Sequence, residues 1–211
     1  MSTQFWREDI ELRRLKIARI SDLNDPFEFS ARAGNQLERQ ALREMKEIQS
    51  KKTGLLCFSK TWKNPVQWSH YAEQHQGICL GFDVPDILAK AVTYRKTPLR
   101  LNRERLQADA NFAQRFADRL VSTKFEDWRY EQEVRLFIKL DPGTELAGLY
   151  FYNFCDSLKL REVIVGAAST LTRNQVCVAL GDLAGEVMVK KARMAFNAFQ
   201  IVEQKNAQLW D

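Results

Sequence analysis

The segment from Asn64 to Gly77 constrains the fold most, because it marks both the start and the end of one helix. Asn64 is a predicted N-cap, since its side chain can accept a hydrogen bond from an amide of the first turn. Pro65 suits the first helical position, where its missing N–H costs nothing. Gly77 suits the left-handed position just past a helix end. Apolar runs at residues 55–59 and 78–82 flank the segment, so the sequence predicts a strand–helix–strand unit.

Composition places the chain among ordinary globular proteins, with 45% hydrophobic and 28% charged residues in a length of 211. That length favours one domain over residues 1–211. The net charge of +5 favours an anionic partner. Four scattered cysteines, none in a C-x-x-C pair, favour reduced thiols in the core of a cytoplasmic protein. There is no apolar signal core and no apolar run of about 18 residues, so no membrane association is predicted.

The remaining patterns predict an alternation of helices and strands. Apolar spacing predicts a short helix and then a strand over residues 10–17, helices at 36–51, 84–90, 101–121 and 172–182, and strands at 92–95, 128–139, 161–166, 186–190 and 194–202. No Ser/Gly-rich linker or repeat divides the chain. We therefore expect one α+β domain in which helices flank a mixed or antiparallel sheet.

Two carboxylates, Glu131 and Glu133, form the pair with the strongest chemical character. In a strand, residues i and i+2 point to the same face. The two charges would repel, so one carboxylate would have a raised pKa or would contact a hydroxyl or a cation. Such a pair suits recognition of ribose hydroxyls or stabilisation of a developing cation. The alternative is a half-exposed strand edge paired with Arg129 and Arg135.

Both histidines lie on the central helix. His70 and His75 are five residues apart, about 140° around a helix, which is poor geometry for a shared metal, so no metal is predicted. His70, on the more polar side beside Tyr71, could donate to a ligand hydroxyl or phosphate. For Trp68, Tyr71 and His75 a core position is the competing interpretation. Ser59 could position a ligand at the end of its strand or simply cap the following turn.

A long basic helix offers a second kind of site. Its polar face and flanks carry Arg95, Lys96, Arg100, Arg103, Arg105, Arg115, Arg119 and Lys124. Acidic residues are interleaved, as on a solvated helix face. The same pattern is also compatible with a surface that faces nucleic acid or phosphate.

Three sequence blocks resemble those of a known family. They are N-D-P-F-E at 24–28, C-F-S at 57–59 followed by W-S-H-Y-A-x-x-H-x-G at 68–77, and W-x-Y-E-x-E-x-R at 128–135. In this order they resemble a widespread, mainly bacterial family of domains of unknown function. That resemblance implies membership of a family and no particular activity.

The order of the blocks is also similar to that of ADP-ribosyltransferases, which bind NAD in a split α+β sheet. One subclass uses an arginine on the first strand, a serine on the second and a late E-x-E strand. The similarity assigns the serine role to Ser59 and the acidic role to Glu131 and Glu133. Glu133 would bind a ribose hydroxyl and stabilise an oxocarbenium-like transition state. Arg19 or Arg14 would supply the arginine.

These resemblances lead to an expected NAD-dependent ADP-ribosyltransferase-like protein, a component of a defence or toxin system, that modifies a nucleic-acid or protein acceptor. Glu133 and Glu131 would be catalytic, and NAD would be the substrate. Ser59, His70, Tyr71 and Arg19 would contact NAD, with support from Asn24, Asp25, Glu28, Trp68 and Arg135. The alternatives are a nucleic-acid-binding module without catalysis, or a Mg²⁺-dependent nuclease built on Asp25, Glu28, Glu131 and Glu133.

Overall fold

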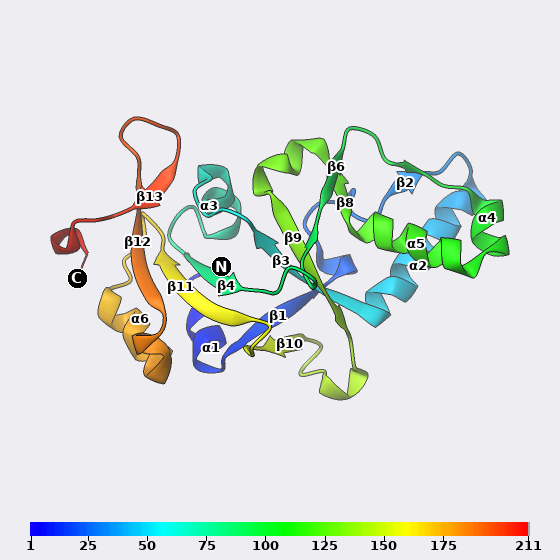
Figure 1. Ribbon diagram of the computed structural model, residues 1–211. Helices are drawn as coiled ribbons and strands as arrows, with labels where there is room; N and C mark the ends of the chain where they lie inside the picture. The colour runs from blue at the N-terminus through cyan, green and yellow to red at the C-terminus, as the bar shows by residue number, and fades with distance from the viewer. Residues whose placement is uncertain (211) are drawn as a thin grey trace. The chain divides into compact units, whose positions relative to one another are not determined.

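The computed structural model describes residues 1–210, and the chain divides by its internal contacts into two compact units. One unit combines Met1–Leu15, Thr61–Pro85 and Tyr152–Asp211, and we call it the terminal unit. The other combines Lys16–Lys60 and Asp86–Phe151, and we call it the central unit. Helices and mixed or antiparallel sheets occur together, which confirms the expected α+β class. Figure 1 shows that strands from distant parts of the sequence join in each sheet.

The central unit is built on an antiparallel strand pair. The main sheet has the order β10-β1-β3-β9-β5, and its strands are β1 (Arg14–Arg19), β3 (Thr53–Ser59), β5 (Lys90–Ala91), β9 (Glu133–Lys139) and β10 (Tyr150–Asn153). The β3–β9 pairing runs without interruption from Thr53 opposite Lys139 to Ser59 opposite Glu133. Two parallel pairs complete the strands: β2 (Ala31–Arg32) with β7 (Leu99–Arg100), and β6 (Thr93–Arg95) with β8 (Thr123–Phe125). The long β3–β9 ladder therefore fixes the register of Ser59 against Glu133.

Helices cover the hydrophobic side chains of the central unit. They are α2 (Gln36–Lys52), α4 (Arg103–Ala108) and α5 (Ala110–Val121), with 3₁₀ turns η1 (Ile20–Asp22), η2 (Glu126–Glu131) and η3 (Pro142–Thr144). The expected helix at 101–121 is broken, because Asp109 has an extended backbone and caps α5 by accepting from the Phe112 amide. Phe116, Leu120 and Leu55 belong to the core that these helices enclose.

The terminal unit holds a four-stranded sheet of order β13-β12-β11-β4. Its strands are β4 (Ile78–Asp83), β11 (Lys159–Val165), β12 (Met188–Met194) and β13 (Ile201–Glu203). Its helices are α1 (Trp6–Glu11), α3 (Pro65–Tyr71) and α6 (Arg173–Leu180), and its 3₁₀ turns are η4 (Gly181–Gly185) and η5 (Ala207–Leu209). Strands β11 and β12 are parallel, so the chain must cross over between them, and α6 forms that crossover.

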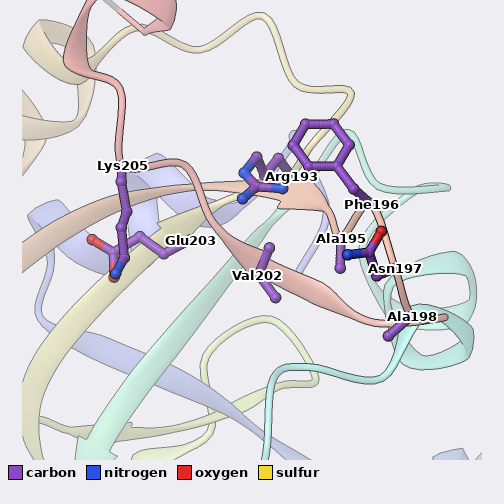
Figure 2. Close-up of a pocket in the computed structure, with 8 residues that line it drawn as sticks. All are labelled: Arg193, Ala195, Phe196, Asn197, Ala198, Val202, Glu203 and Lys205. Atoms are coloured by element: carbon purple, nitrogen blue, oxygen red, sulfur yellow. The ribbon is translucent and has the colours of Figure 1, made fainter.

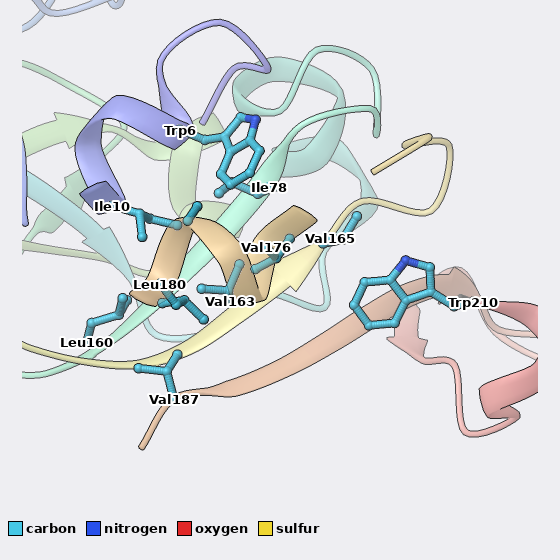
Figure 3. Close-up of a cluster of buried hydrophobic side chains, with 11 residues drawn as sticks. Trp6, Ile10, Ile78, Leu160, Val163, Val165, Val176, Leu180, Val187 and Trp210 are labelled. Carbon is cyan, nitrogen blue, oxygen red and sulfur yellow. The ribbon is translucent and has the colours of Figure 1, made fainter. Parts of the chain in front are cut away.

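The two faces of β11 bury different clusters, because successive strand residues point to opposite sides. Val163 and Val165 pack with Trp6 of α1 and Val176 of α6, as Figure 3 shows. Ile164 packs instead in a cluster with Trp68. The sheet of the terminal unit is therefore apolar on both sides.

Helix α3, the helix predicted between Asn64 and Gly77, ends earlier than its sequence indicates. Asn64 caps it and Pro65 begins it, as expected. However, α3 stops at Tyr71, and Glu73–His75 have left-handed φ angles of 46°, 53° and 71°. Gly77 is needed for a different reason: a Cβ there would lie 2.1 Å from the Met1 carbonyl oxygen. The predicted succession of strand, helix and strand is present as β3, α3 and β4, but β3 and β4 lie in different sheets.

Two further expectations are corrected by local backbone geometry. The short helix predicted at 84–90 is absent, and this segment forms a turn before β5. The strand predicted at 128–139 begins only at Glu133, because Glu126–Glu131 is a 3₁₀ turn and Gln132 is left-handed with φ 47°.

Of the helices in residues 1–210, none combines the length and the apolar composition that a bilayer crossing requires.

Candidate functional site

The central unit encloses a group of five charged side chains, which we call the ionic centre. Its members are Glu28, Lys124, Glu131, Glu133 and Arg135, none more than 6% exposed. Three carboxylates face two cations, so the group carries one excess negative charge when all members are ionised. Burial of charge is costly unless each group is paired and hydrogen-bonded. The contacts of each member therefore decide what the site can do.

Arg135 uses all of its donors. Its NH1 and NH2 groups donate to the two oxygens of Glu28 at 2.9 and 2.6 Å. Its Nε and NH2 donate to the two oxygens of Glu133 at 2.6 and 2.9 Å, and NH1 also donates to the Val121 carbonyl at 2.6 Å. Burial alone would lower the pKa of the guanidinium, but the bonds to Glu28 and Glu133 raise it. These five bonds match the five N–H donors of a guanidinium.

Lys124 supplies the second cation. Its Nζ donates to Glu131 at 2.5 Å and to Glu133 at 3.2 Å, and lies 3.6 Å from Glu28. Burial disfavours the charged ammonium, but the charge of Glu133 and the hydrogen bond to Glu131 raise its pKa. Lys124 therefore lies among all three carboxylates.

Glu133 is held in its ionised form by these cations. Burial by itself would raise the pKa of its carboxyl. Hydrogen bonding and charge from Arg135, together with the charge of Lys124, outweigh burial and lower the pKa. The expected contact with a cation is thus present, but the paired carboxylates are not on one regular strand. Glu131 ends a 3₁₀ turn, and the left-handed Gln132 lets both side chains reach Lys124.

Ser59 meets this acidic turn at the end of β3. It lies directly opposite Glu133 in the β3–β9 ladder. Its hydroxyl donates to the Glu131 carbonyl at 2.6 Å. The Glu133 amide donates to the Tyr94 hydroxyl at 2.7 Å, so this phenol also borders the turn. Residues distant in sequence are thereby joined at one end of the ladder.

The N-D-P-F-E block presents Glu28 to the ionic centre. Asp25 is buried, and one of its carboxylate oxygens accepts from the Phe27 amide at 2.9 Å. The Asp25 carbonyl accepts from the Glu28 amide at 3.0 Å. Asn24 precedes this turn. The block therefore forms a local turn that directs Glu28 toward Arg135.

Arg19 is not beside Ser59. The β1–β3 register sets Arg19 opposite Gly54, five residues before Ser59 and about 17 Å away along the strand. Its Nε contacts Asp22 at 3.3 Å. The other candidate, Arg14, begins β1 and donates to Glu8 at 2.8 Å.

The aromatic and imidazole candidates belong to the terminal unit. Trp68 is buried, donates through Nε1 to the Trp62 carbonyl at 2.6 Å and stacks on His75. These contacts give Trp68 a core position, the competing interpretation from the sequence. His70 and Tyr71 are exposed, and their rings meet edge to face at 6.1 Å between centroids.

Sequence reasoning missed the central role of Lys124. It was grouped with the solvated basic face of the long helix, but the structure buries it. The half-exposed edge considered for Glu131 and Glu133 is also wrong, since both are buried. Of the two arginines proposed as their partners, only Arg135 contacts this pair, whereas Arg129 bonds to Glu126 at 2.7 Å. The sequence did contain one signal: the blocks at 24–28 and 128–135 have more carboxylates than Arg135 alone can pair with, so a further cation is needed.

The net charge of the chain is confined to the central unit. That unit has 21 Lys and Arg against 16 Asp and Glu, while the terminal unit has 11 of each. Several of its basic side chains are exposed: Arg95, Lys96, Arg100, Arg105, Arg115 and Arg119. The excess positive charge is therefore on a surface, whereas the ionic centre beneath is net negative.

Three of the four carboxylates considered for a magnesium site have a protein cation as their neighbour instead. Glu28, Glu131 and Glu133 all lie within 3.6 Å of Lys124. Across residues 1–210, no group of three or more His, Cys, Asp or Glu side chains has an arrangement that could hold a metal ion.

Comparison with known proteins gives one finding. No curated protein and no solved structure matches the chain. Residues 67–136, which are 70 of the 211, match the model of a family described as a protein of unknown function, DUF2971. The matched range contains most of two of the three sequence blocks, and includes the Glu131–Arg135 segment of the ionic centre. This part of the chain is thus similar to a family for which the description gives no activity.

Proposed function

We propose that this protein is an NAD-dependent ADP-ribosyltransferase in which Glu133 is the catalytic carboxylate. The observation that carries the proposal is the direct cross-strand pairing of Ser59 with Glu133. The similarity to ADP-ribosyltransferases assigned these residues to neighbouring roles although they are far apart in sequence. A serine-bearing strand beside an acidic strand is what that assignment requires.

The charge of the ionic centre fits the chemistry. In ADP-ribosyl transfer, the bond from ribose C1′ to the nicotinamide nitrogen breaks and its electron pair leaves with nicotinamide. Positive charge develops on the ribose until the acceptor nucleophile bonds to C1′ and loses its proton. A buried site with one excess negative charge stabilises that developing charge more than solvent does. Glu133 is the carboxylate that would face it.

Access to Glu133 requires one contact to be exchanged. Arg135 makes the shorter bonds to Glu133, whereas Lys124 lies 3.2 Å away. Lys124 keeps its bond of 2.5 Å to Glu131 if it releases Glu133. A ribose hydroxyl could then donate to the released oxygen of Glu133, while Arg135 continues to orient the carboxylate.

The test is transfer of radiolabelled ADP-ribose from NAD to macromolecules in a cell lysate. We expect Glu133→Gln to reduce transfer by about 100-fold or more, as removal of a charge-stabilising group does in other enzymes. Ser59→Ala leaves the charges of the ionic centre intact and should reduce transfer by a smaller factor. Glu126→Gln removes a partly exposed carboxylate that is bonded to Arg129 outside the ionic centre, and it serves as the matched control.

Folding must be checked in parallel, because Glu133 is buried. Circular dichroism and thermal melting of each variant separate loss of chemistry from loss of structure. NAD should also raise the melting temperature of the wild-type protein. The proposal is wrong if folded Glu133→Gln transfers at the wild-type rate, or if wild type neither transfers ADP-ribose nor is stabilised by NAD.

A second candidate is nucleic-acid binding without catalysis, favoured by the confinement of the net charge to the central unit. Its affinity for a labelled oligonucleotide should fall steeply with salt and be indifferent to NAD. The double variant Arg115→Glu/Arg119→Glu should weaken binding, whereas Lys159→Glu/Lys205→Glu in the terminal unit should not. The same reactions with Mg²⁺, with and without EDTA, separate binding from cleavage by a magnesium-dependent nuclease.

A further inference from the structure

The terminal unit contains two open cavities of different chemistry. One, of about 350 Å³, lies at the β12–β13 hairpin, where Figure 2 shows Arg193 beside Phe196. The Arg193 guanidinium stacks on that ring at 4.7 Å and donates to the Met194 carbonyl, so its charge has partners. The other cavity, of about 500 Å³, is lined mainly by polar groups; its lining includes Ser169, Thr170, Thr172, Lys191, Gln208 and Trp210. Its volume is within the range of small-molecule sites.

Among residues 1–210, Lys191 is the only charged side chain that lines this second cavity. It lies on β12 opposite Val165, on the sheet face that packs against α6. Its Nζ donates to the Ser169 carbonyl at 2.6 Å. Within residues 1–210 no carboxylate lies within salt-bridge distance of it, and burial lowers its pKa. A half-buried ammonium without an acidic partner is a charge that a bound anion would stabilise.

The neighbouring lysine shows that this arrangement is particular to Lys191. Lys190 points to the opposite face of the sheet and bonds to Glu162 at 2.5 Å. Around Lys191 the lining instead offers the hydroxyls of Ser169 and Thr170, while the Thr172 hydroxyl caps α6 and donates to Gln175 at 3.3 Å. Arg173 adds a second positive charge nearby, because its guanidinium stacks on the Trp210 indole at 4.8 Å.

We propose that this cavity binds a small phosphate-bearing molecule, with Lys191 as the charged contact and the hydroxyls of Ser169 and Thr170 as further donors. A lysine ammonium recognises phosphate as a point charge. A phosphate group presents several acceptor oxygens in a tetrahedral arrangement, which suits donors that converge from a loop and a strand. The site is independent of the ionic centre and of the transferase proposal.

The experiment is calorimetric titration of the full-length protein with inorganic phosphate, glycerol 3-phosphate and acetate. We expect saturable binding of both phosphates at one site, tighter than acetate by about 10-fold or more. Lys191→Met keeps the aliphatic stem but removes the charge, so it should weaken phosphate binding at least 10-fold. Lys205→Met makes the same change at an exposed position of the terminal unit and should bind as wild type does.

Each outcome decides the proposal. Lys191→Met removes a desolvated charge, so its melting temperature should equal or exceed that of wild type, which excludes unfolding as the cause of lost binding. A stronger signal for glycerol 3-phosphate than for phosphate would identify a phosphate ester as the ligand class. Absence of phosphate binding, equal binding by Lys191→Met and wild type, or equal affinity for acetate would overturn the proposal.

Discussion

The two units of this chain place their charges differently. The central unit encloses the five charged side chains of the ionic centre. The terminal unit encloses Trp6, Ile78 and Val163, and its ion pairs are partly or fully open to solvent, as in Arg161 with Asp83 at 2.6 Å. Within residues 1–210, the one charged side chain of this unit that is buried is Asp9.

This difference in buried charge predicts how the stability of each unit responds to substitution. A buried ionic group is stable only when it is complete, since removing one partner leaves an uncompensated charge. An apolar core loses stability in proportion to the contacts and volume removed. Substitutions in the ionic centre of the central unit should therefore cause large and strongly pH-dependent losses of stability. Substitutions in the core of the terminal unit should cause losses that scale with the contacts and volume removed. Four substitutions test this contrast.

The largest effect is expected for Arg135→Met. It leaves Glu28 and Glu133 buried with only Lys124 as a cation, and should cost about 3–5 kcal/mol in the free energy of unfolding. Hydrogen exchange read by mass spectrometry should show the loss in β3 and β9 peptides.

The pH dependence of this variant sharpens the test. In the wild type, Glu133 has a lowered pKa in the folded state. Its contribution to stability is therefore present above the unfolded pKa and lost as pH falls through the folded value. In Arg135→Met the carboxylates can take up protons instead, so the penalty should be smaller at pH 4 than at pH 8. A penalty below 1 kcal/mol at pH 8 would contradict the prediction that the buried ionic centre is stable only when it is complete.

A core truncation in the terminal unit should cost somewhat less. Leu160 is buried in the cluster with Trp6 and Ile10. Leu160→Ala should cost about 3 kcal/mol through lost burial and a residual cavity. Urea unfolding at pH 5 and pH 8 measures it, and the cost should be the same at both. A strong pH dependence would show that the two units do not differ in the way we describe.

Asp9→Asn should stabilise the terminal unit. Burial, with a smaller contribution from Glu8, raises the pKa of Asp9 to about 6. A raised carboxyl pKa means that stability falls as pH rises from the unfolded value toward about 6. With allowance for solvent screening, we expect a gain of about 1 kcal/mol at pH 7.5 and none below pH 4. Glu11→Gln on the same helix is the control, and an equal gain there would point to a general charge effect.

The smallest effect is expected for Arg161→Met. The pair it makes with Asp83 is exposed to solvent on both sides. Exposed pairs contribute about 0–1 kcal/mol, and salt screens them. Thermal melts in low and high salt should show a shift of no more than a few degrees. A cost comparable with that of Arg135→Met would mean that pairing, rather than burial, controls the stability of both units.

Local signals predicted much of the secondary structure. Asn64 and Pro65 mark the start of α3, and the apolar stripe of residues 36–51 matches α2. The same signals failed where a single residue changed the backbone. Asp109 breaks one long helix into two, and left-handed Gln132 ends a 3₁₀ turn before β9. Capping and left-handed geometry depend on the tertiary partners of each residue, so propensity alone could not locate them.

The candidate site was predictable in part for the same reason. The E-x-E signal and its arginine partner were visible, because Glu133 and Arg135 are neighbours along one strand. The role of Lys124 was not visible, because in the sequence it resembles the exposed basic residues around it. Only the burial of Lys124 on β8 distinguishes it from them.

By itself, the sequence determined the α+β class, the capped start of the central helix and the segments rich in charge, because these follow from periodicity and side-chain chemistry within a few residues. Only the tertiary structure decided that Ser59 faces Glu133 and that the distant Glu28 joins the charges of residues 124–135 in one buried centre. Strand register and burial are set by pairing between segments far apart in the chain. A short window of sequence contains no record of which segment becomes its neighbour.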